Sequence, residues 1–176
     1  MIGLYEIDDD YIDYLRNIDS KVLSTKQGHR VTQRKYVGVI LNNANYNYFI
    51  PLSSYKSATH DSMYESKSFK KIGTMAVLRI NNMIPVPDGV FHRIDFNTVA
   101  DKNYQTLLRN EYRILKVRER EIRTDSRIVY FTRLNDKNKD KSLYKICCDF
   151  KALENGADEW VTNNIRSTKV LIGSTP

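Results

Sequence analysis

Cysteine is scarce in this chain of 176 residues, and so are glycine, histidine and long apolar runs. The two cysteines, Cys147 and Cys148, are adjacent, so they do not readily pair with each other and cannot form a zinc site alone. This usage is typical of a reducing compartment and predicts a cytoplasmic protein. No segment approaches the roughly 20 apolar residues of a membrane-spanning helix. Residues 1–10 are acidic where a secretion signal would be basic and then apolar, so we expect no such signal.

The missing motifs exclude several enzyme classes. The three histidines, His29, His60 and His92, are scattered, and no HExxH pattern for zinc hydrolysis occurs. The chain holds no P-loop, no GxGxxG fingerprint and no GxSxG element. Acidic residues gather in the first 20 positions, where we interpret Asp8 and Asp10 as helix-capping residues rather than ligands of a divalent metal. We therefore predict no metal and no cofactor, and any enzyme built from this chain must work with serine, tyrosine, lysine and arginine.

Cleavage of RNA by the substrate's own 2′-hydroxyl is compatible with these limits. The protein then needs only to position the backbone, stabilise charge and move protons. The composition agrees, because 28 basic residues against 21 acidic ones give a net charge of +7, with basic clusters in segments 26–36 and 109–133. Twelve tyrosines add rings on which bases can stack. The alternative is that the tyrosines are half-buried strand residues and the basic residues form a solvated helix face.

Hydrophobic patterning predicts a single α+β domain with antiparallel strands flanked by helices. We expect helices over residues 8–18, 99–120 and 149–155, and strands over residues 2–7, 35–41, 46–51, 73–80 and 144–148. Residues 126–133 fit a helix or a strand equally well, and residues 52–71 form a long predicted loop. We place the domain at residues 1–160 and expect a loosely ordered tail over residues 161–176.

Serine and lysine side chains follow the strand predicted over residues 46–51. The run Pro51-Leu52-Ser53-Ser54-Tyr55-Lys56 leaves an apolar segment and enters a basic loop. Two small hydroxyls beside a lysine can together hydrogen-bond and neutralise one phosphate. Taken alone, the same pattern also fits an ordinary solvated loop.

The segments around this run resemble the ToxN/AbiQ family of type III toxin–antitoxin endoribonucleases. In that family a G-[IV]-[IV]-L strand pairs with a strand ending in P-L-[TS]-S-x-K, and residues 38–41 and 51–56 match the two patterns. Residues 11–22 resemble the family's first helix and its exit, and residues 81–87 its N-x-M-I-P segment. Residues 148–154 resemble its [CN]-[DN]-F-x-x-L-E motif. Together these matches cover residues 3–155 in the same order.

The resemblance implies a twisted, partly barrel-like antiparallel sheet flanked by helices, related in shape to MazF/Kid-type toxins. It implies a metal-independent, sequence-specific endoribonuclease that leaves a 2′,3′-cyclic phosphate. It also implies an RNA antitoxin of tandem pseudoknot repeats, which the toxin cuts from a precursor and with which it closes into a cyclic protein–RNA assembly. The targets would be cellular or phage mRNA, and the role abortive defence against phage.

The resemblance also assigns catalytic residues by position. Ser54 matches the family's catalytic serine, Ser53 its threonine-or-serine, and Lys56 its active-site lysine. We expect Ser54 to hydrogen-bond the scissile phosphate or orient the 2′-hydroxyl, and Lys56 to stabilise charge or protonate the leaving 5′-oxygen. Two alternatives remain open: a non-catalytic RNA-binding module that uses the same basic groove, and an enzyme in which Ser54 is a covalent nucleophile.

The RNA-binding residues are predicted on less specific grounds. The family places a tyrosine and one or more lysines before the strand that contains Gly38. Residues 24–34 of this chain hold no tyrosine, and the cations available before the strand are Arg30, Arg34 and Lys35, of which Arg34 is at the best-matched position. A basic helix face after residue 108 is our candidate for binding the RNA antitoxin, with a solubilising face as the alternative. Tyr11 aligns with a groove tyrosine of the family, although core packing explains it equally well. The full predicted set is Arg30, Arg34, Lys35, Tyr11, Tyr55, Arg109, Arg113, Lys116, Arg120 and Arg123.

Overall fold

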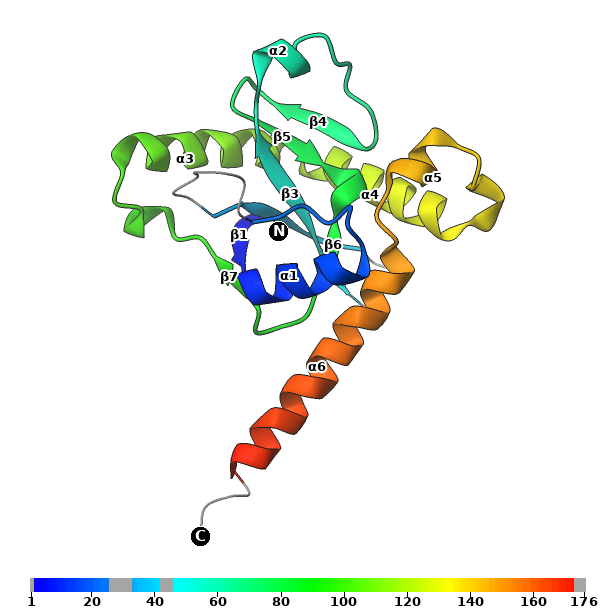
Figure 1. The fold of residues 1–176 in the computed structure, drawn as a ribbon. Helices are drawn as coiled ribbons and strands as arrows, with labels where there is room; N and C mark the ends of the chain where they lie inside the picture. The colour runs from blue at the N-terminus through cyan, green and yellow to red at the C-terminus, as the bar shows by residue number, and fades with distance from the viewer. Residues whose placement is uncertain (1, 26–32, 42–45, 173–176) are drawn as a thin grey trace.

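The computed structural model describes residues 2–25, 33–41 and 46–172, and it confirms an α+β fold with an antiparallel sheet (Figure 1). The strands are β1 (Gly3–Ile7), β2 (Tyr36–Ile40), β3 (Asn47–Ser54), β4 (Phe69–Ile72), β5 (Ala76–Arg79), β6 (Ile84–Val86) and β7 (Phe91–Arg93). The helices are α1 (Asp9–Ile18), α2 (Ser57–His60), α3 (Lys102–Val117), α4 (Glu119–Leu134), α5 (Ser142–Ile146) and α6 (Phe150–Ile172). Short 3-10 turns are η1 (Ile80–Asn82), η2 (Phe96–Thr98) and η3 (Asp136–Asn138). Among the described helices, none has the length and hydropathy of a membrane span.

The central strand β3 changes partners along its length. The sheet order is β4-β5-β3-β2-β1-β7, and β6 pairs with β3 off this path. On one side the pairing with β2 ends where Pro51 faces Tyr36, and on the other side Ser53 and Ser54 pair with β5. The last three residues of β3, Leu52, Ser53 and Ser54, therefore extend beyond the end of β2. In the described strands β4 and β7 do not pair with each other, so the partly barrel-like closure implied by the resemblance is not confirmed.

The glycine of the G-V-I-L run is required by an aromatic ring. Gly38 lies opposite Gly3 where β2 pairs with β1, and an ideal Cβ at Gly38 would come 2.8 Å from Cε2 of Tyr5. The Tyr5 ring packs edge-on against Phe49 and Phe91, with centroids 5.1 and 5.6 Å away. Because these neighbours hold the ring over the glycine pair, a larger residue at position 38 must displace packed side chains.

Helix α1 packs as its sequence pattern predicts. Tyr11, Ile12 and Leu15 are buried on one face, and acidic residues occupy the first turn, where the helix dipole favours them. The capping prediction for Asp8 is only partly correct. Asp8 occupies the N-cap position, but its side chain makes no capping hydrogen bond and instead lies 3.1 Å from Nε2 of His92.

Several elements differ from the sequence prediction. The helix expected over residues 99–120 ends at Val117, and α4 begins at Glu119 and includes the ambiguous segment 126–133. The strand expected over residues 144–148 is wrong, because Ser142–Ile146 forms helix α5. An apolar run this short fits the spacing of a helix as well as that of a strand, so the sequence pattern could not distinguish the two structures. The loop expected over residues 52–71 contains the end of β3, α2 and β4.

Helix α6 is much longer than the helix expected over residues 149–155. It runs from Phe150 through residue 160 to Ile172, and Figure 1 shows it passing α1 and leading away from the sheet. The domain limit at residue 160 and the order of the tail stay predictions, and residues 173–176 lie outside the described part.

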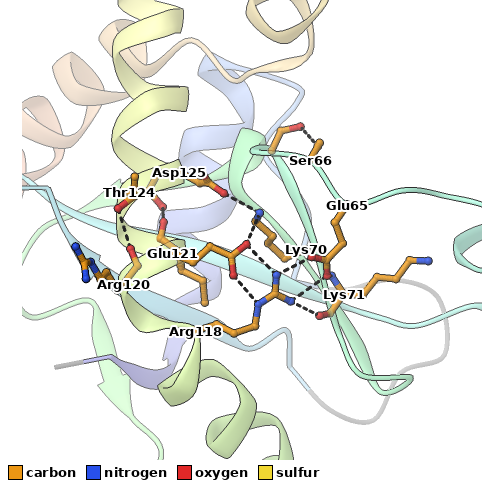
Figure 2. Close-up of polar contacts among 12 residues, drawn as sticks. Glu65, Ser66, Lys70, Lys71, Arg118, Arg120, Glu121, Thr124 and Asp125 are labelled. Carbon is orange, nitrogen blue, oxygen red and sulfur yellow. Dashed lines mark hydrogen bonds and ion pairs between the residues drawn. The ribbon is translucent and has the colours of Figure 1, made fainter.

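An ion-pair network joins the β4–β5 hairpin to α4 (Figure 2). Nζ of Lys70 lies 2.7 Å from carboxylate oxygens of both Asp125 and Glu121. Arg118, at the α3–α4 junction, pairs with Glu121 and with Glu65, which precedes β4. These hydrogen bonds lower the pKa of Glu121 to about 2. The network therefore fixes β4, and through it β5, beside the end of β3.

Candidate active site

A small pocket lies where β3 extends beyond β2. Its volume is about 100 Å³. The lining residues come from the segment before β2, the end of β3, the start of β5 and one side of α3: Gln33, Arg34, Lys35, Leu52, Ser53, Ser54, Met75, Ala76, Tyr104, Leu107 and Glu111. The pocket thus brings two of the three predicted catalytic residues together with two of the predicted RNA-binding cations.

Arg34 positions the hydroxyl of Ser53. The side chain of Arg34 is buried, and its Nη1 donates hydrogen bonds of 2.8 Å to Ser53 Oγ and to the Leu52 carbonyl. Its Nε donates to the Ser24 carbonyl at 2.9 Å. Because Ser53 Oγ accepts a hydrogen bond from a cation, its own proton is available for a phosphate oxygen in the pocket. Arg34, which the sequence predicts to bind phosphate, thus orients a serine in this structure.

Ser54 and Lys35 complete the polar lining. Ser54 is the last residue of β3, is exposed, and faces Ala76 in the pairing with β5. Nζ of Lys35 pairs with Oε1 of Glu6 and lies 5.8 Å from the centre of the Tyr104 ring. These groups present hydroxyl donors and a partly neutralised ammonium to the pocket.

Lys56 lies outside the set that lines the pocket. It is exposed at the N-cap position of α2, and its backbone N–H donates to Nδ1 of His60 at 2.8 Å. Burial and the cations Arg79 and Lys56 lower the pKa of His60, which favours a neutral ring with its proton on Nε2. The histidine therefore holds the start of α2, so the flexible lysine side chain is anchored two residues beyond Ser54.

Tyr55 and Tyr11 make structural contacts. The Tyr55 hydroxyl donates to Asp61 at 2.5 Å, and its backbone N–H donates to the Met75 carbonyl. Tyr11 is fully buried and donates to the Pro85 carbonyl at 2.8 Å, as the core-packing alternative predicts. Arg30 lies outside the described residues.

The predicted basic helix face is divided between two helices. A hollow of about 490 Å³ lies at the α3–α4 junction, and its basic lining residues are Lys116, Arg120, Arg123 and Arg127. Arg123 also pairs with Glu119, which lines the same hollow. Arg109 donates to Asn97 and Arg113 to Asn110, so these two arginines have partners on or before α3. The fold thus gathers three predicted cations and adds Arg127.

Glu111 is not among the site residues predicted from the sequence. This residue lines the pocket from α3 and is 6% exposed, and burial raises the pKa of its carboxyl to about 7. The signal was present in the sequence, because Leu108, Glu111 and Leu115 follow helical spacing and form the buried stripe of α3. An acid inside an apolar stripe is unusual enough to indicate a functional position.

The C-terminal family motif, residues 148–154, packs in the core and does not line the pocket. The buried carboxylate of Glu154 accepts hydrogen bonds from the hydroxyls of Tyr48 and Tyr130 at 2.9 and 2.7 Å. Phe150 packs against both tyrosine rings, with centroids 5.8 Å away. In the N-x-M-I-P segment, Asn82 donates to Sγ of Cys148. These two motifs therefore meet in the core, where α6 begins.

The chain matches known proteins over most of its length. A family model described as toxin ToxN of type III toxin–antitoxin systems matches residues 3–158. The endoribonuclease ToxN of Bacillus thuringiensis subsp. kurstaki is 36% identical over 165 residues, which cover 89% of this chain and 82% of that protein.

Two solved structures share the fold. One comes from work on type III toxin–antitoxin systems and selective toxin inhibition by a non-coding RNA pseudoknot; its TM-score is 0.75 at 33% identity, covering 90% of this chain and 97% of that one. The other is AbiQ, a lactococcal anti-phage endoribonuclease of the type III class, with a TM-score of 0.76 at 30% identity, covering 92% and 99%. These matches confirm the resemblance seen in the sequence motifs. The chain therefore belongs to the ToxN/AbiQ family of endoribonuclease toxins from type III toxin–antitoxin systems.

Proposed function

We propose that the chain cuts RNA in the pocket at the end of β3 by attack of the substrate's 2′-hydroxyl on the adjacent phosphate, without a metal ion. The products are a 2′,3′-cyclic phosphate and a 5′-hydroxyl end. The observation that carries the proposal is the convergence of two serine hydroxyls, a buried guanidinium and an ammonium on one pocket. Such a set stabilises the negative charge that develops on the phosphorane.

Each pocket side chain has a definable role in this scheme. Ser53 donates its proton to a non-bridging phosphate oxygen, because Arg34 occupies its acceptor side. Ser54 hydrogen-bonds the same phosphate or orients the 2′-hydroxyl. Lys35 adds positive charge at the wall of the pocket. Lys56, which is exposed at the start of α2 and does not line the pocket, has to extend toward the bound RNA to stabilise charge or to protonate the leaving 5′-oxygen.

The test of cleavage uses purified protein and a mixed-sequence RNA in excess EDTA. Cleavage with cyclic phosphate ends supports the proposal, and cleavage only after magnesium or zinc is added contradicts it. Ser54→Ala should lower the rate at least about 100-fold, as loss of a transition-state donor does, while Ser62→Ala, at an exposed serine of the neighbouring loop, keeps the parent rate. Binding without cleavage would indicate the alternative RNA-binding module, and a phosphoserine adduct would indicate covalent catalysis.

The role of Lys56 is tested separately. Lys56→Ala should lower the cleavage rate without changing the free energy of unfolding, because the side chain is exposed. Lys67→Ala removes an exposed lysine from the same loop and serves as the matched control. If both variants cleave at the parent rate, Lys56 has no catalytic role.

We further propose that an RNA antitoxin made of tandem pseudoknot repeats inhibits this toxin and is processed by it, in a cyclic protein–RNA assembly. The support is that a related toxin is selectively inhibited by a non-coding RNA pseudoknot, and that AbiQ is an anti-phage endoribonuclease. Cytoplasmic location and abortive phage defence, through cleavage of cellular or phage mRNA, belong to the same proposal.

The hollow at the α3–α4 junction is the proposed contact for the RNA backbone. Changing Lys116 and Arg120 to glutamine should weaken RNA binding uniformly across sequences and reduce the salt-dependence slope by about 1 per lost phosphate contact. Lys151→Gln removes an exposed charge from α6 and controls for net charge. An unchanged slope would assign the hollow to solubility alone.

A further inference from the structure

One acidic side chain faces the candidate active site and has no role in the scheme above. Glu111 lines the same pocket as Ser53 and Ser54 and is 94% buried, since only 6% of it is exposed. Its carboxylate makes no hydrogen bond or ion pair with any residue that the structure describes. The group is therefore a buried acceptor that remains available to a molecule in the pocket.

A structural role does not account for this carboxylate. The neighbouring positions of the same buried stripe on α3 are Leu108 and Leu115, which pack without a desolvation penalty. A carboxylate at the intervening position must be desolvated without compensation from a partner, which is unfavourable for folding. Proteins accept such a penalty mainly where the group performs chemistry.

We propose that Glu111 is the general base of the cleavage reaction and removes the proton from the attacking 2′-hydroxyl. As the proton moves to the carboxylate, the bond between the 2′-oxygen and phosphorus forms. The bond between phosphorus and the 5′-oxygen then breaks, and the 5′-oxygen receives a proton, the role given to Lys56 above. The carboxylic acid returns its proton to water after the product leaves. This inference rests on the proposed function, because it assigns one step of that reaction.

The surroundings of Glu111 suit it to proton transfer. Arg34 and Lys35 line the pocket from the segment before β2, Ser53 and Ser54 line it from β3, and the ring of Tyr104 lines it from α3. Within the described residues Glu111 is the only carboxylate that lines the pocket. Burial raises its pKa to about 7, which is close to the value that favours efficient proton exchange at neutral pH. The cleavage rate should therefore rise with pH to a plateau above about pH 7, because only the ionised carboxylate accepts a proton.

The first test compares Glu111→Gln with the parent protein on one RNA. The amide has nearly the same shape but cannot accept the proton, so the cleavage rate should fall at least about 100-fold, the usual contribution of a general base, while RNA affinity stays within about twofold. Glu111→Asp should recover part of the activity. Glu159→Gln, on the exposed side of α6, is the control and keeps the parent rate. A Glu111→Gln variant with the parent rate would overturn the inference.

The second test separates a base from an acid. An RNA whose scissile 5′-oxygen is replaced by sulfur has a leaving group that needs no protonation. If Glu111 is the base, Glu111→Gln remains as defective on this substrate as on normal RNA, and recovery of its rate would contradict the assignment. The pH profile of the parent is a test that needs no variant, and the absence of a rising limb below pH 7 overturns the inference. Failure of the parent to cut any RNA would instead contradict the proposed function.

Discussion

Removing the Lys70 ammonium should destabilise the protein, because the carboxylate of Asp125 then stays buried without its cation. The Lys70 side chain is 7% exposed and that of Asp125 is 12% exposed, whereas that of Glu121 is 43% exposed and also binds Arg118. Lys70→Met keeps an apolar side chain of similar length. The loss of the Lys70 ion pair should change the energy of Glu121 little, because Glu121 is partly solvated and still pairs with Arg118. Asp125 becomes a buried charge without a described partner. Removing one partner of such a buried pair typically lowers the free energy of unfolding by about 3–5 kcal/mol. Because Asp125 is partly solvated, we expect a loss of about 3 kcal/mol.

Urea denaturation at pH 7, followed by far-ultraviolet circular dichroism, measures this loss. The double variant Lys70→Met with Asp125→Leu replaces both partners by apolar residues and should return to within about 1 kcal/mol of the parent, because paired burial of apolar groups offsets the lost ion pair. With Asp125→Leu alone, the four proteins form a double-mutant cycle whose coupling energy should exceed about 1.5 kcal/mol. A Lys70→Met variant within about 0.5 kcal/mol of the parent would show that Asp125 does not depend on Lys70, and so would a double variant no more stable than Lys70→Met alone.

Three further outcomes follow from the packing and from the buried acids. Gly38→Ala should cost about 1–3 kcal/mol in urea denaturation because the Tyr5 ring must move, and a smaller residue at position 5 should remove most of that cost. Glu154→Leu leaves two buried tyrosine hydroxyls without their acceptor and should cost about 2–4 kcal/mol, whereas Glu154→Gln keeps an acceptor and costs less than half as much; equal losses would contradict the hydrogen-bonding account. The pKa of Glu111 is raised from 4.5 to about 7 in the folded protein, so the stability that its neutral form provides is complete below pH 4.5 and is lost as pH rises through 7. Glu111→Gln lacks this loss and should gain up to about 3 kcal/mol relative to the parent between pH 4.5 and pH 8; parallel stability curves would contradict the shift.

The local elements that the sequence predicted well are those with a strong period or with turn residues at their ends. The strands around Val37 and Phe49 and the helix that contains Leu15 are found close to where their patterns place them. The segment 144–148 failed because its few apolar residues fit a helix as well as a strand. The break at Arg118 was not visible either, since α3 and α4 continue one polar, helix-forming sequence.

Some features of the candidate site were likewise predictable from the sequence, whereas others depend on the fold. Ser53, Ser54 and Lys56 follow one another along the chain, so a motif identifies them without a structure. The hydrogen bond from Arg34 to Ser53 spans 19 residues, and its geometry depends on where β2 stops beside β3. The structure also left Lys56 out of the pocket lining, since the chain turns into α2 directly after it.

The sequence alone determined the family, the α+β class and the residue types available for chemistry, because motifs, periodicity and composition are properties of the chain read in order. Which side chains share the pocket became clear from the three-dimensional fold alone: Tyr11 lies in the core, Arg34 bonds to a serine, and Glu111 of α3 lies at the end of β3. These relations depend on which faces of distant elements meet and exclude water. The spacing of Leu108, Glu111 and Leu115 predicts an acid on the buried face of α3, but no short stretch of residues shows that this acid meets the end of β3.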